Sequence, residues 1–497
     1  MIYNFNHGIG WASSGVEYAQ AYRAGVLRRL GYDARFIFTD MITNENIEHL
    51  TANIGFEDAE VIWLYTFFTD IRIAPTTYTV AQLEETFAKK PVTVKRDVKT
   101  IRYNFEGSNN FYMVYLTKPG TDLVHCVEMV ANGCLIRKDF YTYCKVFTEY
   151  YAPLDGKAHL YQRRFFNEDG TTAYDEITDG DSVMYKFPDK LLGSKQELVA
   201  YMVERLDFTE NDTVIIDRTE DIAQPVLQNK GRSRVGVVIH ADHFSEGNTD
   251  EDYILWNNYY EYDFSMYKHL DFYISSTDAQ NRLVREQFKQ YVGAEPNVVT
   301  IPVGSNDELR HPSSQRKVHS LITASRLAAE KHVDWLIEAV AEAKKQVPDV
   351  SLDIYGKGVE EDKLKDLIKK SSLQDSVRLM GQYDLTEVYK DYEVYLSGST
   401  SEGFGLTLME AMGSGVPIIG FDVRYGNQTF IEDGRTGYLI PVHDEMDKAE
   451  RVKELSDRIV RIFTEADLES MHEYSYEMGA KYLTKEVEKK WTELLCF

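Results

Sequence analysis

The sequence has few cysteines and lacks long apolar runs, and both features limit what the protein can be. Its 497 residues include only Cys126, Cys134, Cys144 and Cys496, too few for a disulfide framework. Their spacing fits no metal-site template, so we expect packed thiols in a reducing, cytoplasmic setting. No apolar run reaches the roughly 18 residues of a membrane span, and residues 1–30 lack the pattern of a secretion signal. We therefore expect neither a span nor a signal.

Positive charge is also scarce. The chain has 55 Lys and Arg residues against 80 Asp and Glu residues, which gives a formal net charge of −25. A protein this acidic is a poor candidate for binding nucleic acid, polyphosphate polymers or an anionic bilayer through its overall field. We expect no nucleic-acid partner. A phosphate-containing ligand would need a local site that overrides the overall charge.

The hydrophobic pattern divides the chain into domains, as its length allows. Residues 1–68 and 207–303 alternate short apolar strands with helical stretches, which predicts a Rossmann-like domain. Residues 304–480 repeat this alternation and predict a second such domain, in which residues 385–390 are one of the expected helices. Residues 481–497 predict a C-terminal helix that could pack back on the first domain. Two domains of this kind would place a ligand cleft at the carboxyl ends of their strands.

Residues 69–206 have a different pattern. Runs of aromatic and β-branched residues are separated by turn sequences such as Pro-Gly at 119–120 and Asn-Gly at 132–133. This alternation is typical of an antiparallel meander. We interpret the segment as an inserted, extended β-sheet domain. Its aromatic residues form either the core of the sheet or a contact face for an acceptor or partner.

Two glutamates, Glu402 and Glu410, lie on either side of a glycine-rich turn. A buried strand is expected before the turn, over residues 393–397, and a helix after it, over residues 406–412. The free N–H groups and dipole of such a helix start attract an anion. With Glu410 two turns into the helix, the carboxylates would be about 10 Å apart along its axis. That distance suits a long ligand held at two points better than two carboxylates acting on one bond.

Other polar residues are expected at the carboxyl ends of strands. His240 ends a strand predicted over residues 235–239, where it either contacts a ligand or is a hydrogen-bonded structural histidine. Arg326 follows a strand predicted over residues 320–324, and Lys331 lies five residues further on. Two cations at this point are either surface charges or the groups that neutralise a diphosphate leaving group without a metal.

A glycine loop at residues 8–15 joins the first predicted strand to the first predicted helix. Its spacing differs from the dinucleotide-binding fingerprint, and no acidic residue of the expected kind clearly follows the second strand. We therefore predict no NAD site. A phosphate contact centred on Gly15 fits the loop better.

The order Arg326, Lys331, Glu402 and then Glu410 resembles the retaining glycosyltransferases of GT-B fold and family-4 type, which use nucleotide-sugar donors. This resemblance extends over residues 302–437. It implies an α/β fold with two Rossmann-like domains facing a cleft and, in this chain, an antiparallel β-sheet domain inserted in the N-terminal half.

Four further segments are similar to the A subunit of the accessory-Sec glycosyltransferases, which O-glycosylate serine-rich-repeat adhesins of Gram-positive bacteria. They are residues 8–20, 53–56, 251–260 and 426–434, and the resemblance covers essentially the whole chain. It implies a retaining enzyme that moves N-acetylglucosamine from UDP-N-acetylglucosamine to Ser or Thr of the adhesin, as the first step of its glycosylation. The alternatives are the same enzyme with UDP-glucose, and a non-catalytic partner subunit of the same assembly.

The resemblance also implies site residues, each at the position that matches the family. The implied catalytic residues are His240, Arg326, Lys331 and Glu402. The implied donor-binding residues are the phosphate-side Gly15, Val16, Glu17 and Tyr18, the uracil-side Gln382 and Tyr383, the sugar-side Glu402, Gly403, Phe404 and Gly405, and the ribose-side Glu410. Glu402 would orient the sugar, and a nucleophilic role for it stays open. No cofactor and no metal are implied, because the UDP-sugar is a substrate.

The partners implied by the resemblance are a non-catalytic, stabilising B subunit, the adhesin acceptor and the UDP-sugar. The implied location is the cytoplasm, with peripheral association of the complex at the inner face of the membrane as a further option. Two rival classes fit less well. A glycoside hydrolase would not use the two cations, and a transferase acting on wall teichoic acid conflicts with the net charge of −25.

Overall fold

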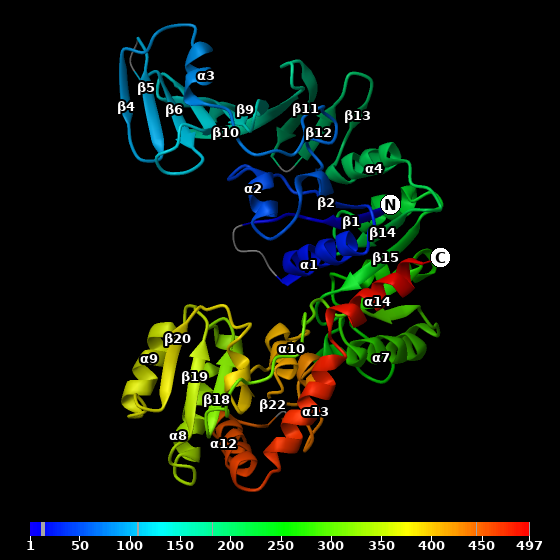
Figure 1. Cartoon of the computed structure of the whole chain (residues 1–497). Coiled ribbons are helices and arrows are strands. Elements are labelled where there is room, and N and C mark those ends of the chain that lie inside the picture. The colour runs from blue at the N-terminus through cyan, green and yellow to red at the C-terminus, as the bar shows by residue number, and fades with distance from the viewer. Residues whose placement is uncertain (11–14, 107–108, 181, 444, 497) are drawn as a thin grey trace. The chain divides into compact units, whose positions relative to one another are not determined.

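The computed structural model describes residues 1–10, 15–106, 109–180, 182–443 and 445–496 (Figure 1). Their strands form two parallel sheets and one antiparallel sheet. Contacts group the chain into two compact units, residues 1–238 with 256–272 and residues 239–255 with 273–497. Within the described part of the chain, no helix is both long and apolar enough to cross a membrane.

The sheet that contains the N-terminal strand is parallel and has the order β17-β16-β15-β14-β1-β2-β3. In β1, Ile2 aligns with Thr213 of β14 on one side and with Ala34 of β2 on the other. The strands are β1 (Ile2–Asn6), β2 (Ala34–Phe38), β3 (Val61–Trp63), β14 (Thr213–Ile216), β15 (Arg234–Ile239), β16 (Phe272–Ser275) and β17 (Val298–Thr300). The helices in these parts of the chain are α1 (Gly15–Arg29), α2 (Ile47–Ala52), α4 (Lys195–Leu206), α5 (Ala223–Asn229), α6 (Glu261–Ser265) and α7 (Asp278–Gln287).

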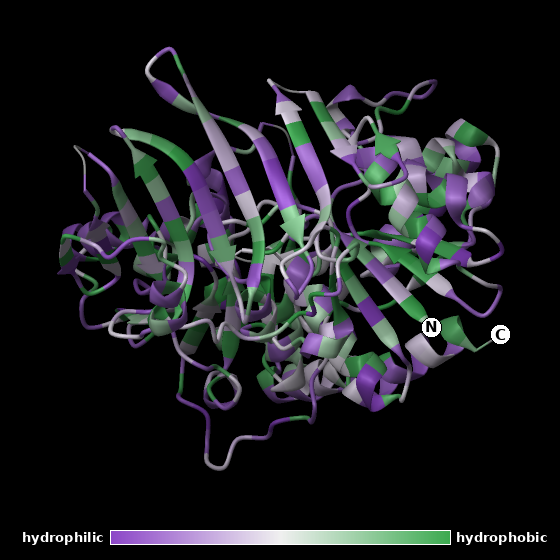
Figure 2. Cartoon of the chain, turned by 90° about the horizontal axis from the view of Figure 1, so that it is seen from above, coloured by the Kyte–Doolittle hydropathy of each residue, from purple (hydrophilic) through white to green (hydrophobic). Residues whose placement is uncertain are grey.

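The antiparallel sheet has ten strands that follow one another in chain order, from β4 to β13. They are β4 (Thr93–Arg96), β5 (Thr100–Asn104), β6 (Phe111–Leu116), β7 (Val124–Ala131), β8 (Cys134–Tyr141), β9 (Lys145–Leu154), β10 (Lys157–Phe166), β11 (Thr172–Asp179), β12 (Ser182–Lys186) and β13 (Leu191–Leu192), with α3 (Val80–Glu85) ahead of them. Asn132 and Gly133 both have positive φ, as a two-residue hairpin turn requires. Hydrophobic and hydrophilic residues alternate along several strands (Figure 2).

The sequence leaves open whether the aromatic residues of this segment are buried in a core or form a contact face, and the structure shows both kinds. Tyr103, Phe165 and Tyr174 are fully buried. Tyr103 belongs to an apolar cluster of the sheet, whereas Phe165 stacks on Tyr65, outside the sheet, with 5.6 Å between ring centroids. Tyr115 and Tyr161 are exposed and remain candidates for a contact face.

The third sheet is parallel and has the order β20-β19-β18-β21-β22-β23. Its strands are β18 (Ser320–Ala324), β19 (Ser351–Tyr355), β20 (Val377–Gly381), β21 (Val394–Ser397), β22 (Ile418–Phe421) and β23 (Gly437–Ile440). The order is that of a doubly wound Rossmann sheet, in which the chain changes direction between β18 and β21. Loops that follow these two strands therefore meet at one edge of the sheet, which is where such sheets bind ligands.

Two apolar clusters cover this third sheet, one made largely with α8, α9 and α12 and the other largely with α10. The helices of this region are α8 (Val333–Ala343), α9 (Glu361–Lys370), α10 (Leu406–Gly413), α11 (Gly426–Phe430), α12 (Lys448–Thr464), α13 (Leu468–Ala480) and α14 (Thr484–Leu495). In α14, the ammonium of Lys490 donates to the carbonyl of Thr300 in β17 at 3.2 Å.

The sequence interpretation is wrong at two points in this unit. Residues 385–390 do not form the predicted α-helix; the described chain has turns there and the short 3-10 helix η6 (Tyr389–Asp391). The buried ring of Tyr389 gave this segment a helix-like apolar spacing. In addition, α10 begins at Leu406, so Glu410 lies about one turn into the helix and not two. Helix α13 was not predicted.

Candidate functional site

The turn before α10 has a backbone shape that only glycine adopts easily. Gly405 has a φ of +84°, and a Cβ at this position would lie 2.7 Å from the Cδ1 atom of Leu408. The carbonyl of Glu402 accepts hydrogen bonds from the backbone N–H groups of Tyr425 at 2.6 Å and Gly426 at 2.7 Å. These bonds fix the backbone of Glu402 at the start of the turn, so the direction of its side chain is well defined.

The carboxylate of Glu402 is paired with Lys331. The Lys331 ammonium lies 2.7 Å from Oε2 of Glu402, and the two side chains are 17% and 20% exposed. Ser399 contacts both groups at 3.4 Å. Lys331 ends the 3-10 helix η5 (Ala329–Lys331) after β18, and Glu402 follows β21. The change of chain direction between those strands therefore brings together a cation and a carboxylate that are 71 residues apart.

Arg326, the second predicted cation, has a different environment. Its side chain is 79% exposed and pairs with Glu330 at 3.2 Å. An exposed pair of this kind contributes little stability, so the guanidinium can change partners at small cost. The structure brings Lys331 to Glu402, whereas it pairs Arg326 with Glu330.

The other end of the motif is half-buried and lies against a buried tyrosine. Oε2 of Glu410 accepts a hydrogen bond from the hydroxyl of Tyr389 at 3.0 Å, and Tyr389 is only 1% exposed. Burial raises the pKa of Glu410, and the bond from Tyr389 partly opposes that rise. The charge of Asp384 raises this pKa further and the charge of Arg310 lowers it. Sequence reasoning missed Tyr389, because it lies in the segment interpreted as a helix.

The predicted base-contacting residues lie after β20. Gly381 has a φ of +78°, which turns the chain out of the strand. Gln382 is exposed, and Tyr383 is 65% exposed with its ring edge-on to Tyr355 at 6.2 Å between centroids. An exposed aromatic ring in a loop can stack on a planar base.

His240 follows β15 and is half-buried. A Cβ at Gly403 would lie 3.6 Å from the carbonyl oxygen of His240, so the two segments are in contact. Three residues further on, Nδ1 of the buried His243 lies 3.1 Å from the hydroxyl of Tyr425. Burial lowers the pKa of His243 to about 4, so this histidine is neutral at pH 7.

The predicted phosphate-side residues belong to the first compact unit, where Gly15 begins α1. The buried carboxylate of Glu17 lies 3.3 Å from the Asn6 amide and 3.4 Å from the Arg218 guanidinium. Val16 is half-buried, and Tyr18 is 53% exposed. Residues 11–14 of the glycine loop lie outside the described residues.

Phe404 completes the sugar-side segment. It is buried, and its ring lies 5.4 Å from that of Phe430. Phe404 therefore anchors the turn in the core, while Glu402 and Gly403 are less buried. No cluster of three or more His, Cys, Asp or Glu side chains suited to a metal was found among the described residues.

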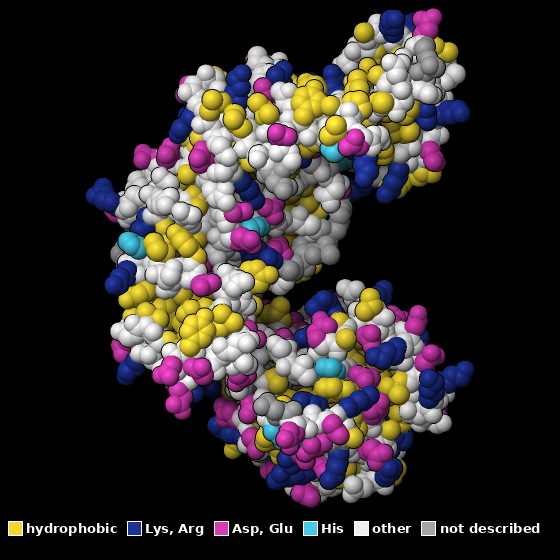
Figure 3. Space-filling model, turned by 180° about the vertical axis from the view of Figure 1, so that it is seen from behind, with side chains coloured by type: hydrophobic (Ala, Val, Ile, Leu, Met, Phe, Trp, Pro, Cys, Tyr) yellow, Lys and Arg dark blue, Asp and Glu magenta, His cyan; other side chains and the backbone are white. Residues whose placement is uncertain are grey.

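On the face seen in Figure 3, acidic and basic side chains are interspersed. The second compact unit offers a lysine, the start of a helix, and two half-buried carboxylates with different partners. This combination suits a ligand with an anionic group and hydroxyl groups on either side of it.

Comparisons with known proteins agree with this geometry. Residues 93–189 match the family described as "GtfA extended beta-sheet domain", and residues 306–475 match "Glycosyl transferases group 1". Together with the three sheets, these matches and the structural similarities below confirm the predicted fold class, a GT-B α/β fold with an inserted antiparallel sheet in the N-terminal half.

Two relatives are similar over their whole length. The chain is 52% identical to the UDP-N-acetylglucosamine–peptide N-acetylglucosaminyltransferase GtfA subunit of Streptococcus agalactiae, covering 100% of this chain and 98% of the relative. It is 50% identical to the GtfA subunit of Streptococcus gordonii, covering 99% and 98%.

Two solved structures are also similar. A crystal structure of a GtfA/B complex has a TM-score of 0.97 at 50% identity and covers 100% of this chain and 99% of that chain. The pneumococcal O-GlcNAc transferase GtfA in complex with UDP and GlcNAc has a TM-score of 0.88 at 50% identity and covers 99% and 98%.

Proposed function

The chain belongs to the family of GtfA subunits of UDP-N-acetylglucosamine–peptide N-acetylglucosaminyltransferases, and on that basis we propose that it transfers N-acetylglucosamine from UDP-N-acetylglucosamine to a protein. The acceptor in this proposal is the Ser and Thr hydroxyls of a serine-rich-repeat adhesin, and transfer is its first glycosylation step. The observation that carries the proposal is the Lys331–Glu402 pair, 2.7 Å apart, at the start of the helix that bears Glu410.

The leaving group explains why a lysine is needed there. When the bond between the anomeric carbon and the phosphate oxygen breaks, negative charge develops on the diphosphate. The Lys331 ammonium, the exposed Arg326 and the N–H groups of the glycine turn would stabilise this charge, so the proposal includes no metal and no cofactor. Since Arg326 pairs with the exposed Glu330 at 3.2 Å, it can swing to the ligand at little cost.

Retention of configuration follows if both bonds change on one face of the sugar. The acceptor oxygen forms a bond to the anomeric carbon, and its proton passes to the departing phosphate oxygen on the same side. The electron pair of the broken bond leaves with UDP. Glu402, fixed by its backbone bonds to Tyr425 and Gly426, would orient the sugar. His240, whose carbonyl adjoins Gly403, would contact the sugar from another segment.

The remaining donor contacts are assigned by the same reasoning. Glu410 would accept hydrogen bonds from the ribose hydroxyls, and Gln382 and Tyr383 would contact the uracil. Gly15, Val16, Glu17 and Tyr18 of the first unit would contribute the phosphate-side loop. The buried Glu17 is held by Asn6 and Arg218, so its part would be to shape the loop.

A partner subunit belongs to the proposal. The similar structure of a GtfA/B complex supports a B subunit for this chain. We assign residues 69–206, which contain the ten-stranded sheet, to docking of that subunit or of the acceptor. The assembly would act in the cytoplasm, with peripheral association at the inner face of the membrane.

Mass spectrometry of a serine-rich-repeat peptide tests this proposal. The full chain with its B subunit is incubated with the peptide and with either UDP-N-acetylglucosamine or UDP-glucose. We expect peptide masses that increase by N-acetylhexosamine units. If only hexose units were added, the donor would be UDP-glucose and not UDP-N-acetylglucosamine. A peptide that stays unmodified with both donors would contradict the proposed activity. Titration calorimetry with UDP separates a catalytic subunit from a non-catalytic one, because only the former needs the donor site.

A further inference from the structure

A short segment that joins two sheets also holds α10, the helix that bears Glu410, in place. Residues 304–310, here called the connector, lie between β17 and β18 and run along α10. The amide of Asn306 donates to the carbonyl of Met409 at 3.0 Å, and the backbone N–H of Arg310 donates to the carbonyl of Gly413 at 2.9 Å. The helix that carries Glu410 is thus bonded to the connector near its middle and at its end.

Close packing accompanies these bonds. A Cβ at Gly304 would lie 2.4 Å from the Cδ2 atom of Leu406, the first residue of α10. A Cβ at Gly413 would lie 2.3 Å from the amide nitrogen of Asn306. Glycine at both positions therefore allows the connector to lie directly against the helix.

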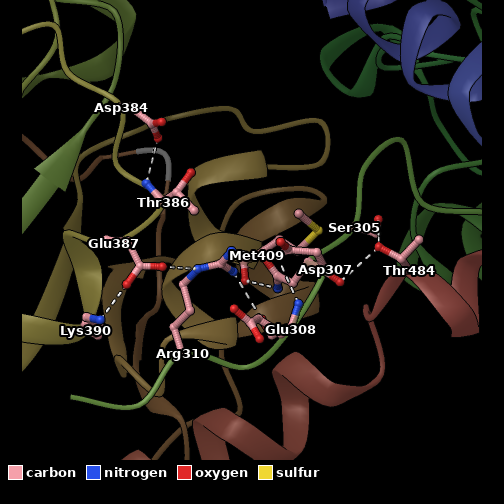
Figure 4. Close-up of polar contacts among 11 residues, drawn as sticks. Ser305, Asp307, Glu308, Arg310, Asp384, Thr386, Glu387, Lys390, Met409 and Thr484 are labelled. Carbon is pink, nitrogen blue, oxygen red and sulfur yellow. Dashed lines mark hydrogen bonds and ion pairs between the residues drawn. The ribbon is translucent and has the colours of Figure 1, made fainter. Parts of the chain in front are cut away.

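The connector is itself fixed by the segment before α14. The backbone N–H of Asn306 donates to the carbonyl of Tyr482 at 2.9 Å, and the N–H of Thr484 donates to the carbonyl of Asn306 at 2.8 Å. The hydroxyls of Ser305 and Thr484 lie 2.9 Å apart (Figure 4). The connector is therefore a held element and not a loose link.

The side chain of Arg310 reaches from the connector to a second element. Its Nη2 atom lies 2.6 Å from Asp307, its Nη1 atom 3.2 Å from the carbonyl of Glu308, and its Nε atom 3.0 Å from Oε1 of Glu387 (Figure 4). The guanidinium is 11% exposed, whereas Glu387 is 60% exposed. Lys390 pairs with the other oxygen of Glu387.

Glu387 belongs to residues 382–391, here called the base loop. The same loop contains Tyr383, whose ring contacts that of Tyr355 edge-on, and Tyr389, whose hydroxyl donates a hydrogen bond to Glu410. One arginine therefore contacts both elements assigned to the nucleotide, α10 through its backbone and the base loop through its side chain.

We propose that Arg310 is a positioning residue for the nucleotide, because it sets the base loop relative to α10 so that Tyr383 and Glu410 meet the base and ribose of one donor molecule. This inference rests on the proposed function, since it assumes a nucleotide in this site. Holding both elements in place before binding reduces the entropy lost when the ligand orders them. Arg310 contacts neither the sugar-side residue Glu402 nor Lys331 in the described structure. Its loss should therefore weaken donor binding and leave the transfer step unchanged.

The size of the effect follows from the exposure of each group. Arg310 makes three charge-assisted bonds from a nearly buried position, so Arg310→Met should raise the Kd for UDP by about tenfold. Glu387 is exposed, and Glu387→Gln should raise the Kd by about threefold. Arg435 is a matched control, since it also pairs with two acidic residues, Glu432 and Glu477, from a surface position. Arg435→Met should leave the Kd unchanged.

Titration calorimetry with UDP, on the full chain with its B subunit, tests the inference. The donor KM should rise in parallel with the Kd, while kcat at saturating donor stays within about twofold. The double variant Arg310→Glu with Glu387→Arg should bind UDP more tightly than Arg310→Glu alone, because the pair is restored in reverse.

Three results would overturn the inference. One is a folded Arg310→Met variant that binds UDP like the wild type. Another is a kcat that falls while the Kd stays constant. If Arg310→Met does not fold, the Glu387→Gln variant is measured in its place. A Kd for UDP equal to that of the wild type in Glu387→Gln would then overturn the inference. A wild-type protein that binds no UDP would contradict the proposed function itself, which distinguishes the two failures.

Discussion

The two ends of the glutamate motif differ in chemistry although they lie on one turn and one helix. At the sugar end, Glu402 forms an ion pair with Lys331 at 2.7 Å. At the proposed ribose end, Glu410 is half-buried and accepts a hydrogen bond from the neutral phenol of Tyr389 at 3.0 Å. The first arrangement places a positive charge beside a carboxylate, and the second places a carboxylate beside a neutral hydroxyl group. On the proposed function we expect a division of labour, with transition-state stabilisation at the Lys331–Glu402 end and ground-state binding at the Glu410 end.

The largest expected effect is at the sugar end. Lys331→Ala removes the cation that would neutralise the leaving diphosphate, so kcat should fall by about 100- to 1,000-fold. Steady-state kinetics with UDP-N-acetylglucosamine and the adhesin peptide measure it. Lys448→Ala is a suitable control, because Lys448 also pairs with acidic residues, Asp334 and Glu338, in the same unit. An unchanged kcat in Lys331→Ala would show that Lys331 does not stabilise the leaving diphosphate.

Glu402→Gln should have the second largest effect. The amide keeps the shape of the side chain but leaves Lys331 without its charged partner, and the sugar is oriented less well, so kcat should fall by about tenfold. The same kinetics distinguish the two roles considered for this residue. A loss of more than about 10⁴-fold would identify Glu402 as a nucleophile, since covalent catalysis cannot proceed through the amide.

Glu410→Gln should act on binding alone. Loss of the carboxylate that would accept hydrogen bonds from the ribose hydroxyls should raise the Kd for UDP by about tenfold. The kcat at saturating donor should stay nearly unchanged. Calorimetry with UDP and kinetics at high donor concentration give the two numbers. If kcat fell as far as in Glu402→Gln, the two ends would not differ in the way their surroundings indicate.

The smallest expected effect is that of Tyr389→Phe, and it depends on pH. The phenol favours the ionised form of Glu410, so its removal should raise the pKa of that carboxyl further above its ordinary value. At neutral pH we expect a loss in UDP affinity of about threefold. As pH falls, Glu410 takes up a proton before an ordinary glutamate would, and affinity should fall with it.

The sign of the pH effect can be checked on stability as well. Because the folded pKa of Glu410 is raised, the folded state binds more protons than the unfolded state between the two pKa values. The contribution of this group to the free energy of unfolding therefore rises as pH falls through the folded pKa. Glu410→Gln should abolish this contribution, and Tyr389→Phe should move it to higher pH. Binding and melting curves of the three proteins between about pH 5 and pH 8 would show the shift.

Much of the fold could be predicted because its strands are continuous apolar runs and its turns are rich in glycine. The strand, glycine turn and helix around Glu402 and Glu410 followed from about 20 residues of sequence, although Glu410 lies about one turn into the helix and not two. The pairing of Lys331 with Glu402 could be expected only in outline, since it depends on the strand order β18-β21, which links residues 71 apart. The resemblance to a family supplied the individual roles.

The contacts that could not be predicted are those made across the fold by irregular segments. Tyr389 lies in a turn whose apolar spacing indicated a helix, so its bond to Glu410 was hidden. Arg310 lies in the connector, 77 residues from Glu387, and nothing in the local sequence marks it as more than a surface charge. Both residues are identified only when the backbone of the base loop is known.

Single-turnover transfer at saturating UDP-N-acetylglucosamine tests the division of labour most directly. Lys331→Ala and Glu410→Gln are compared with the wild type in one experiment, so that binding no longer limits the rate. We expect a rate reduced by about 100-fold or more in Lys331→Ala and a rate within about twofold of wild type in Glu410→Gln. Equal losses in the two variants, or a loss only in Glu410→Gln, would contradict it.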